Sequence, residues 1–189
     1  SLYINFDSIV WACEDDVNLT VPYNVTSGNF LSCDLEIVAD GKSYVDLNDV
    51  RPESNMLVFP MPEDIIPGVY DLNIKFAESS CGLESVSLPM HIYYSKSILV
   101  QRWGDVLAVT NEDYNGGYEF IAFQWYKNGL PIEGAISSIL YQPEGLDLNA
   151  EYSVLLTRRD DSVTMMSCVA ELKNLDANGT EIIVFKTDN

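Results

Sequence analysis

The 189-residue sequence has one histidine, His91, and four cysteines that form no Cys-x-x-Cys pair. Zinc sites usually combine several Cys and His ligands at close spacing, so we expect no metal site of this kind. In the predicted strand His91 lies on the face opposite to Met90 and Ile92, so we expect its side chain to face solvent or a neighbouring surface. No nucleophile or carboxylate lies near it in a sequence pattern typical of a catalytic site. The 29 acidic residues show no glycosidase-like pairing either, so we predict no catalytic residue, no cofactor and no enzyme.

Basic residues are also scarce, with 10 Lys and Arg against 29 Asp and Glu and a formal net charge of −19. Nucleic acids and anionic membranes need basic surface to bind, so neither is an expected partner. The chain has no run of about 18 apolar residues, and we predict no membrane insertion. No secretory signal precedes Ser1, so we expect a processed or trimmed piece of a longer parent chain with other domains.

Alternation of apolar and polar residues dominates the sequence, and no window of a dozen residues keeps a helical period. The connections are too short for helical crossovers, which predicts antiparallel pairing. A polar link near Tyr94–Ser97 separates two groups of strand-like runs. The first group, within residues 1–95, is strongly acidic, with 15 acidic and 3 basic side chains. We therefore predict an all-β chain of two tandem antiparallel immunoglobulin-like β-sandwich domains, residues 1–95 and 96–189.

The segment YEFIAFQWYKNG, residues 118–129, carries the best architectural signal. Alternation puts Ile121, Phe123 and Trp125 on one face, and Asn128-Gly129 is typical of a hairpin turn. An inward Trp before a turn fits the immunoglobulin sandwich, in which a Tyr further on fixes a corner through its hydroxyl. Trp125 and Tyr152 are the predicted core residues. Val154 stands where antibody domains have a Cys, so no intersheet disulfide is expected there.

The opposite face of the same segment carries Tyr118, Phe120 and Tyr126. An exposed aromatic strip is a reasonable contact surface for a protein or a glycan. The alternative is that the other domain or a loop covers these rings.

Acidic clusters such as Glu14-Asp15-Asp16 and Asn111-Glu112-Asp113 could hold a structural calcium ion, which prefers several oxygen ligands. None has the spacing of an EF-hand loop. Ordinary turn chemistry, with Asx side chains accepting backbone hydrogen bonds, is the simpler interpretation.

Three runs of the second half, QRWGDVLAVTN, FQWYKNGLPIEGA and YQPEGLDLNAEYSVLLT, resemble the Ig-like repeats of secreted surface proteins of Bacteroidetes. The first half resembles the module that often precedes such a repeat. The resemblance implies an exported, cell-surface or extracellular module in adhesion, ligand binding or spacing, with an unidentified protein or glycan partner. The alternative is an accessory, glycan-binding region of a larger extracellular enzyme.

Cys13 and Cys81 lie near predicted strand ends, whereas Cys33 and Cys168 share the phase of buried apolar residues. We therefore predict a single Cys13–Cys81 disulfide, with Cys33 and Cys168 as small buried hydrophobes. In an exported chain this bond would close a loop of roughly 70 residues and stabilise the fold by about 4 kcal/mol.

Overall fold

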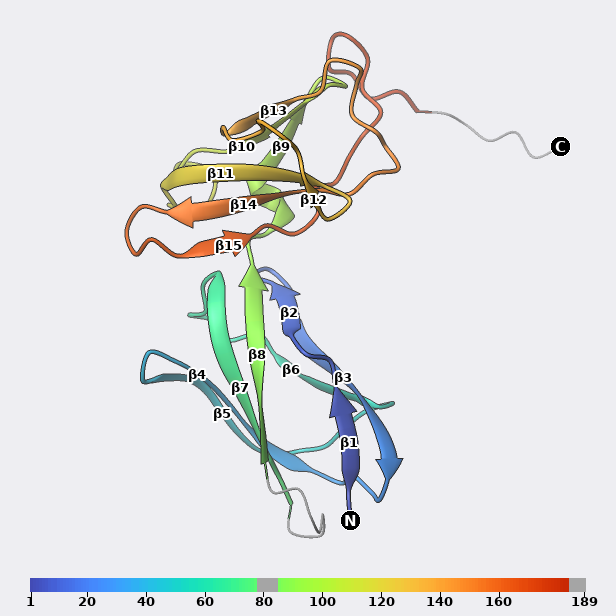
Figure 1. Cartoon of the computed structure of the whole chain (residues 1–189), viewed down its shortest axis with the longest axis vertical. Helices are drawn as coiled ribbons and strands as arrows, with labels where there is room; N and C mark the ends of the chain where they lie inside the picture. The colour runs from blue at the N-terminus through green and yellow to red at the C-terminus, as the bar shows by residue number, and fades with distance from the viewer. Residues whose placement is uncertain (78–84, 184–189) are drawn as a thin grey trace, which may run out of the picture. The chain divides into compact units, whose positions relative to one another are not determined.

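A computed structural model describes residues 1–77 and 85–183. The chain forms two compact units, Ser1–Tyr93 (unit 1) and Tyr94–Asn189 (unit 2), and β-strands make up almost all of the regular secondary structure in the described part of each (Figure 1). Among the described residues the one helical element is the 3-10 turn η1, Lys96–Ile98. The all-β class is therefore as predicted. That the two halves fold independently, with a division at residue 95, stays a prediction.

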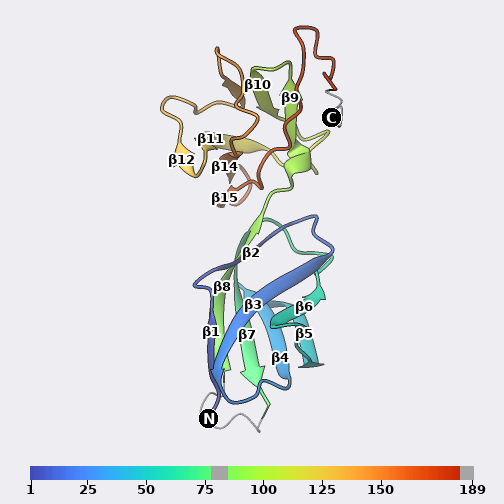
Figure 2. The ribbon, with the colours of Figure 1, turned by 90° about the vertical axis from the view of Figure 1, so that its right-hand side faces the viewer.

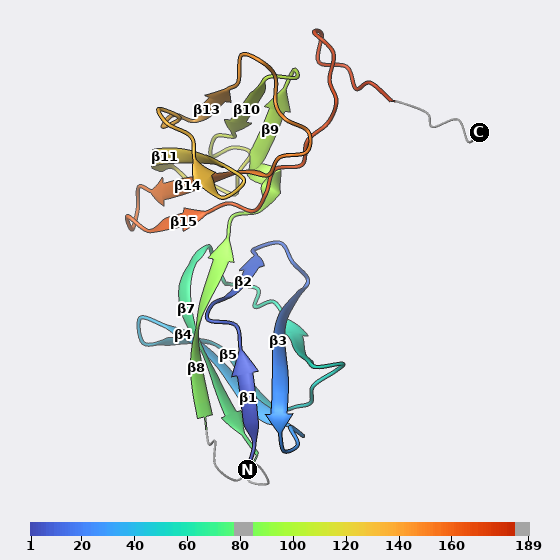
Figure 3. The same cartoon turned by 45° about the vertical axis from the view of Figure 1, so that its right-hand side comes forward.

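Unit 1 is a sandwich of two sheets, which lie on opposite sides of the unit in Figure 3. The first sheet has the order β1-β3-β6, all antiparallel. Its strands are β1 (Tyr3–Phe6), β3 (Asn18–Ser27) and β6 (Met56–Pro60). In Figure 2 the long strand β3 runs obliquely across β7 of the other sheet, as expected for packed twisted sheets.

The second sheet of unit 1 has the order β2-β8-β7-β4-β5. Its strands are β2 (Val10–Cys13), β4 (Cys33–Ala39), β5 (Lys42–Val50), β7 (Gly68–Phe76) and β8 (Ser85–Tyr93). One pairing departs from the expected antiparallel pattern, because β2 runs parallel to β8. The reason is that the chain crosses from the first sheet to the second between β1 and β2, keeping its direction.

The core of unit 1 follows the predicted period of two. The inward residues of β4 and β7 are buried as expected: Cys33, Leu35, Ile37, Tyr70, Leu72, Ile74 and Phe76. Strict alternation would place Val17 on the inward face with Leu19 and Val21, yet Val17 is 83% exposed. It precedes the first residue of β3, so the strand alternation does not govern it.

Unit 2 has one sheet of order β13-β10-β9 and another of order β12-β11-β14-β15. In Figure 1 the strands β11, β14 and β15 lie side by side, with β9, β10 and β13 forming the other layer. The strands are β9 (Leu99–Arg102), β10 (Val106–Val109), β11 (Phe120–Lys127), β12 (Leu130–Pro131), β13 (Ile139–Tyr141), β14 (Tyr152–Arg158) and β15 (Thr164–Met166). All of the pairings in these two sheets are antiparallel.

Trp125 and Tyr152 lie at the centre of unit 2, and both are 0% exposed. The indole N–H of Trp125 donates a hydrogen bond to the carbonyl oxygen of Ser137, at 2.8 Å. The hydroxyl of Tyr152 accepts a bond from the backbone N–H of Asp147, at 3.0 Å, which fixes the corner before β14. Asn128 and Gly129 both have positive φ, and they form the turn between β11 and β12.

A β-bulge corrects the predicted faces of β11. The register against β14 shifts between Phe120 and Ala122, so the residue between them gains no partner. As a result Ile121, expected to point inward with Phe123 and Trp125, is 49% exposed. Phe120 instead turns to the inner side, where its ring lies 6.2 Å from that of Phe123.

The run near the end of the chain does not form the strand that its composition suggests. The run EIIVFK, residues 181–186, has the β-branched and aromatic composition typical of a strand. However, Glu181 forms only an isolated bridge with Leu175, and residues 182 and 183 are not in a strand. Residues 184–186 of this run lie outside the described part.

The cysteines require a correction. Cys33 is a buried free thiol, as expected. Cys168, expected to be a buried thiol too, is disulfide-bonded, as is Cys13. Cys81, the predicted partner of Cys13, lies outside the described residues. The Cys13–Cys81 bond therefore stays a prediction.

Candidate functional site

The segment between β10 and β11 is shaped by Asn115, whose side chain is buried. Its amide nitrogen donates to the carbonyl oxygens of Thr110 and Tyr118, both at 2.9 Å, and its amide oxygen accepts from the N–H of Tyr118, at 2.8 Å. Gly116 and Gly117 supply the positive φ values that this tight return requires. One polar side chain thus closes the loop and sets Tyr118 in place.

Beside this loop lies an open hollow of about 340 Å³, which we call the Phe120 hollow. It combines aromatic rings with polar and charged groups. Its lining residues are Val109, Thr110, Asn111, Glu112, Tyr118, Glu119, Phe120, Phe123, Ser138 and Arg159. On its rim the guanidinium of Arg159 lies 2.9 Å from the carboxylate of Glu119, with both side chains more than half exposed. A hollow of this kind suits binding through apolar contact and a few hydrogen bonds.

The predicted contact surface is only partly brought together. Tyr118 and Phe120 both line the Phe120 hollow, and both pack edge-on against the buried ring of Tyr94, with ring centroids 5.3 and 5.1 Å away. They are therefore half-buried rather than fully outward-facing. Tyr126 lies further along β11, paired with Ser153 and Pro131, and is not part of the hollow.

A buried arginine supports these rings from behind. Arg158 is 5% exposed; its guanidinium bonds the carboxylate of Asp161 at 2.9–3.2 Å and the hydroxyl of Tyr94 at 3.1 Å. Burial acts to lower the pKa of Arg158, but the hydrogen bonds that its guanidinium donates to Asp161 and to the Tyr94 hydroxyl raise it overall. The hydrogen bond from Arg158 in turn lowers the pKa of Asp161. This ion pair holds the aromatic cluster together.

Unit 1 has a second candidate surface, around Trp11, that the sequence reasoning missed. The indole of Trp11 is 58% exposed and stacks on the ring of Tyr93, with centroids 5.4 Å apart and planes inclined by 19°. The alternation in VWAC contained the signal, because Val10 and Ala12 are buried and Trp11 between them must face outward. His91 is half-buried, and its ring lies 6.4 Å from that of Tyr93.

The acidic clusters show turn chemistry. The carboxylate of Asp16 accepts a hydrogen bond from the N–H of Cys13, and the amide oxygen of Asn111 accepts one from the N–H of Asp113. Cys13, Asp15 and Asp16 have ligand atoms within 4.8 Å of one another, but the sulfur of Cys13 is in a disulfide and is not a thiolate. Two exposed carboxylates remain, and structural calcium there stays the untested alternative.

No model of a known protein family matches the sequence, and no curated protein matches it. Among the described residues no helix is long and apolar enough to cross a membrane.

Several solved structures have a similar arrangement of strands. One is SGBP-B of the Bacteroides ovatus mixed-linkage glucan utilization locus, in complex with a mixed-linkage heptasaccharide: 11% identity, TM-score 0.32, covering 90% of this chain and 47% of that one. Another comprises the FN1–FN3 domains of chicken CNTN1: 11% identity, TM-score 0.33, covering 89% and 66%. A third is the apo β-glucuronidase 3 of Bacteroides uniformis: 8% identity, TM-score 0.28, covering 89% and 25%.

This chain thus spans about half the length of the first of these proteins, and less than that of the third. Likenesses at such TM-scores are too weak to carry an argument about function. The residues of the chain itself must carry it.

Proposed function

We propose that this chain is a non-catalytic β-sandwich module of an exported protein and that it acts in ligand binding or adhesion. The observation that carries the proposal is the Phe120 hollow, in which aromatic rings and exposed polar groups meet at one face of unit 2. Apolar contact supplies affinity in such sites, and the few polar groups orient the ligand.

The surroundings of the hollow favour recognition over chemistry. Glu119 and Arg159 neutralise one another at 2.9 Å on an exposed rim, so neither is held as a general base or nucleophile. The rings of Tyr118 and Phe120 are held by Tyr94, and a rigid surface loses less entropy when it binds. The acidic chain also disfavours polyanionic partners, which leaves proteins and glycans.

A screen of the purified chain against glycan and extracellular-protein arrays tests the proposal, with Arg159→Gln as the site variant. Arg51→Gln is a matched control, because Arg51 is also an exposed arginine beside a carboxylate, that of Asp49 at 3.6 Å, but lies in unit 1. We expect a partner that is retained by Arg51→Gln and weakened by Arg159→Gln. Turnover of a substrate by the chain, or a partner insensitive to Arg159→Gln, would contradict the proposal or its site.

A spacing role, with no ligand at all, would produce no array signal. The accessory-region alternative predicts the same binding and differs only in the parent chain, where a catalytic domain would adjoin these residues.

A further inference from the structure

Trp11 leaves more than half of a large aromatic side chain in water, at 58% exposure. It lies on β2, an edge strand that pairs only with β8 within its sheet. Scattered apolar residues on a surface need no explanation, but an indole that is both exposed and fixed in place is unusual.

The strand register explains why Trp11 is fixed. Trp11 lies opposite His91, and Cys13 opposite Tyr93, so Tyr93 is the diagonal neighbour of the indole on the outer face of the sheet. The two rings stack at 5.4 Å with nearly parallel planes. A ligand that contacts Trp11 therefore meets a ring whose rotamer is already set, which lowers the entropic cost of binding.

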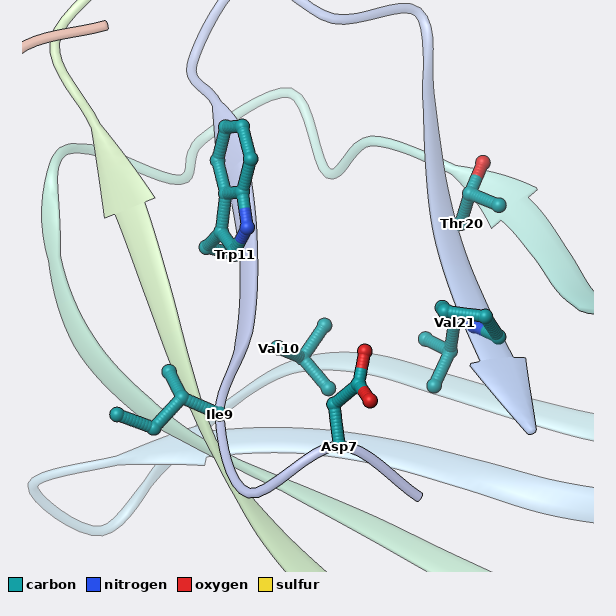
Figure 4. A pocket seen from close by; sticks show the side chains of 7 residues that line it. Asp7, Ile9, Val10, Trp11, Thr20 and Val21 are labelled. Atoms are coloured by element: carbon teal, nitrogen blue, oxygen red, sulfur yellow. The ribbon is translucent and has the colours of Figure 1, made fainter. Parts of the chain in front are cut away.

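Next to the indole is a hollow of about 210 Å³ between β2 and β3. Asp7, Trp11 and Thr20 contribute to its lining, and Val10 and Val21 form part of its apolar wall. Figure 4 shows the carboxylate of Asp7 pointing up into the gap, below Trp11, with Thr20 on the far side. Asp7 and Thr20 are both exposed, and in the described part of the chain Asp7 forms no ion pair.

We propose that this surface of unit 1 binds a neutral hexopyranose oligosaccharide. A pyranose ring has one face of C–H groups and an edge of hydroxyls. The negative face of an indole attracts the C–H groups, while a carboxylate accepts hydrogen bonds from the hydroxyls and a threonine hydroxyl can donate or accept. Trp11, Asp7 and Thr20 supply these three complements around one hollow.

The charge and the ring geometry exclude two other ligand classes. Residues 1–95 carry 15 acidic and 3 basic side chains, so a uronic-acid or sulfated saccharide would be repelled. A quaternary ammonium ion is bound best in a cage of rings that face one another across a space. Trp11 and Tyr93 instead lie against each other, inclined by 19°, and offer a flat surface rather than a cage.

This site shares no residue with the Phe120 hollow, so the two proposals can fail separately. The test is affinity electrophoresis of the full chain in gels that contain neutral β-glucan, xylan, mannan or starch, followed by titration calorimetry with the matching oligosaccharide. Alginate and choline are included as the anionic and cationic alternatives. We expect retardation by at least one neutral polysaccharide.

The variants assign the binding to Trp11. Trp11→Ala should weaken it by about tenfold or more, as for an aromatic hot spot, and Asp7→Asn by several-fold. Trp103→Ala is the matched control, because Trp103 is 51% exposed and lies in unit 2; it should bind as the wild type does. Circular dichroism shows whether each variant is folded. If Trp11→Ala does not fold, Asp7→Asn still tests the site, because it alters only one exposed side chain. Binding that survives both substitutions, binding of alginate or choline alone, or no retardation by any polysaccharide would each overturn the proposal.

Discussion

The indole nitrogen of Trp125 and the carbonyl oxygen of Ser137 are joined by a hydrogen bond of 2.8 Å in the interior of unit 2. The Trp thereby links β11 to the segment that leads into β13, in the opposite sheet. We expect Trp125→Ala to lower the free energy of unfolding by about 3–5 kcal/mol, because a large buried ring is replaced by a cavity. Trp125→Phe should cost less, since it keeps most of the apolar volume. Urea denaturation measures both, and near wild-type stability of the Ala variant would contradict the central position of this ring.

Each unit has its own turn that a tyrosine hydroxyl holds in place through backbone hydrogen bonds. Tyr152 accepts from the N–H of Asp147 at 3.0 Å, and Tyr70 accepts from the N–H of Ile66 at 3.3 Å and donates to its carbonyl oxygen at 2.5 Å. Tyr70→Phe and Tyr152→Phe should each lower the free energy of unfolding by about 1 kcal/mol, because each deletes a hydroxyl that is hydrogen-bonded to the backbone of the preceding turn. Differential scanning calorimetry should show each effect in the transition of its own unit. A single transition that both variants shift equally would show that the units unfold together.

The Arg158–Asp161 pair predicts a pH dependence of stability. The hydrogen bond from Arg158 lowers the pKa of Asp161 from its ordinary 3.8, against the raising effect of burial. A carboxylate whose folded pKa is depressed stabilises the fold above its unfolded pKa, and this stability is lost as pH falls through the folded value. Asp161→Asn should therefore lower stability at pH 7, and the deficit should shrink below about pH 4. The Asp161 side chain is 43% exposed and solvent screens its charge, so we expect a loss of about 1 kcal/mol, at the low end for a charged hydrogen bond.

The control for this experiment is Asp160→Asn, because Asp160 is the exposed neighbouring acid. It should change the stability at pH 7 by less than about 0.5 kcal/mol. Equal pH profiles for wild type and Asp161→Asn, measured by urea midpoint from pH 2 to 7, would show that the pair does not couple to folding.

The thiols give a chemical prediction. Burial, with a smaller contribution from Asp34, raises the pKa of Cys33 to about 12, so almost no thiolate is present at pH 8. Iodoacetamide should label Cys33 only after denaturation. The variant Ser8→Cys is the control, because it introduces a cysteine at an exposed position that should react at once in the native chain. Peptides with Cys13 or Cys168 should carry label only after reduction.

The same non-reduced digest tests the disulfide predicted from the sequence. A linked species that contains Cys13 and Cys81 would confirm that pairing, and a species that links Cys13 to another cysteine would exclude it. Rapid native labelling of Cys33 would contradict its burial.

Independent folding of the two halves remains to be tested by limited proteolysis and by expression of residues 1–95. We expect cleavage near residues 93–97 and a cooperative melt for the isolated first half. If residues 1–95 do not fold and the link resists protease, the tandem-domain interpretation is wrong.

Local chemistry was enough to predict most of the strands and their inward faces. Two features depend only on neighbouring residues and could therefore be predicted from the sequence: the period of two in β4 and β7, and the Asn128-Gly129 turn. The burial of Trp125 and the corner of Tyr152 followed from the same patterns combined with the fold class. Tyr118 and Phe120 could also be marked as aromatic residues of interest.

Only the tertiary structure decided the rest, because it depends on which distant strands pair and in what register. The bulge at Phe120 reversed the face of Ile121, and no local residue demanded it. The parallel pairing of β2 with β8 brought Trp11 onto Tyr93, 82 positions later in the chain, and so created the surface beside Asp7. The sequence by itself determined the all-β class and the cores of the units, since these need only periodicity. The two candidate binding surfaces arise from contacts between residues that are far apart in the chain, and the folded structure alone sets those contacts.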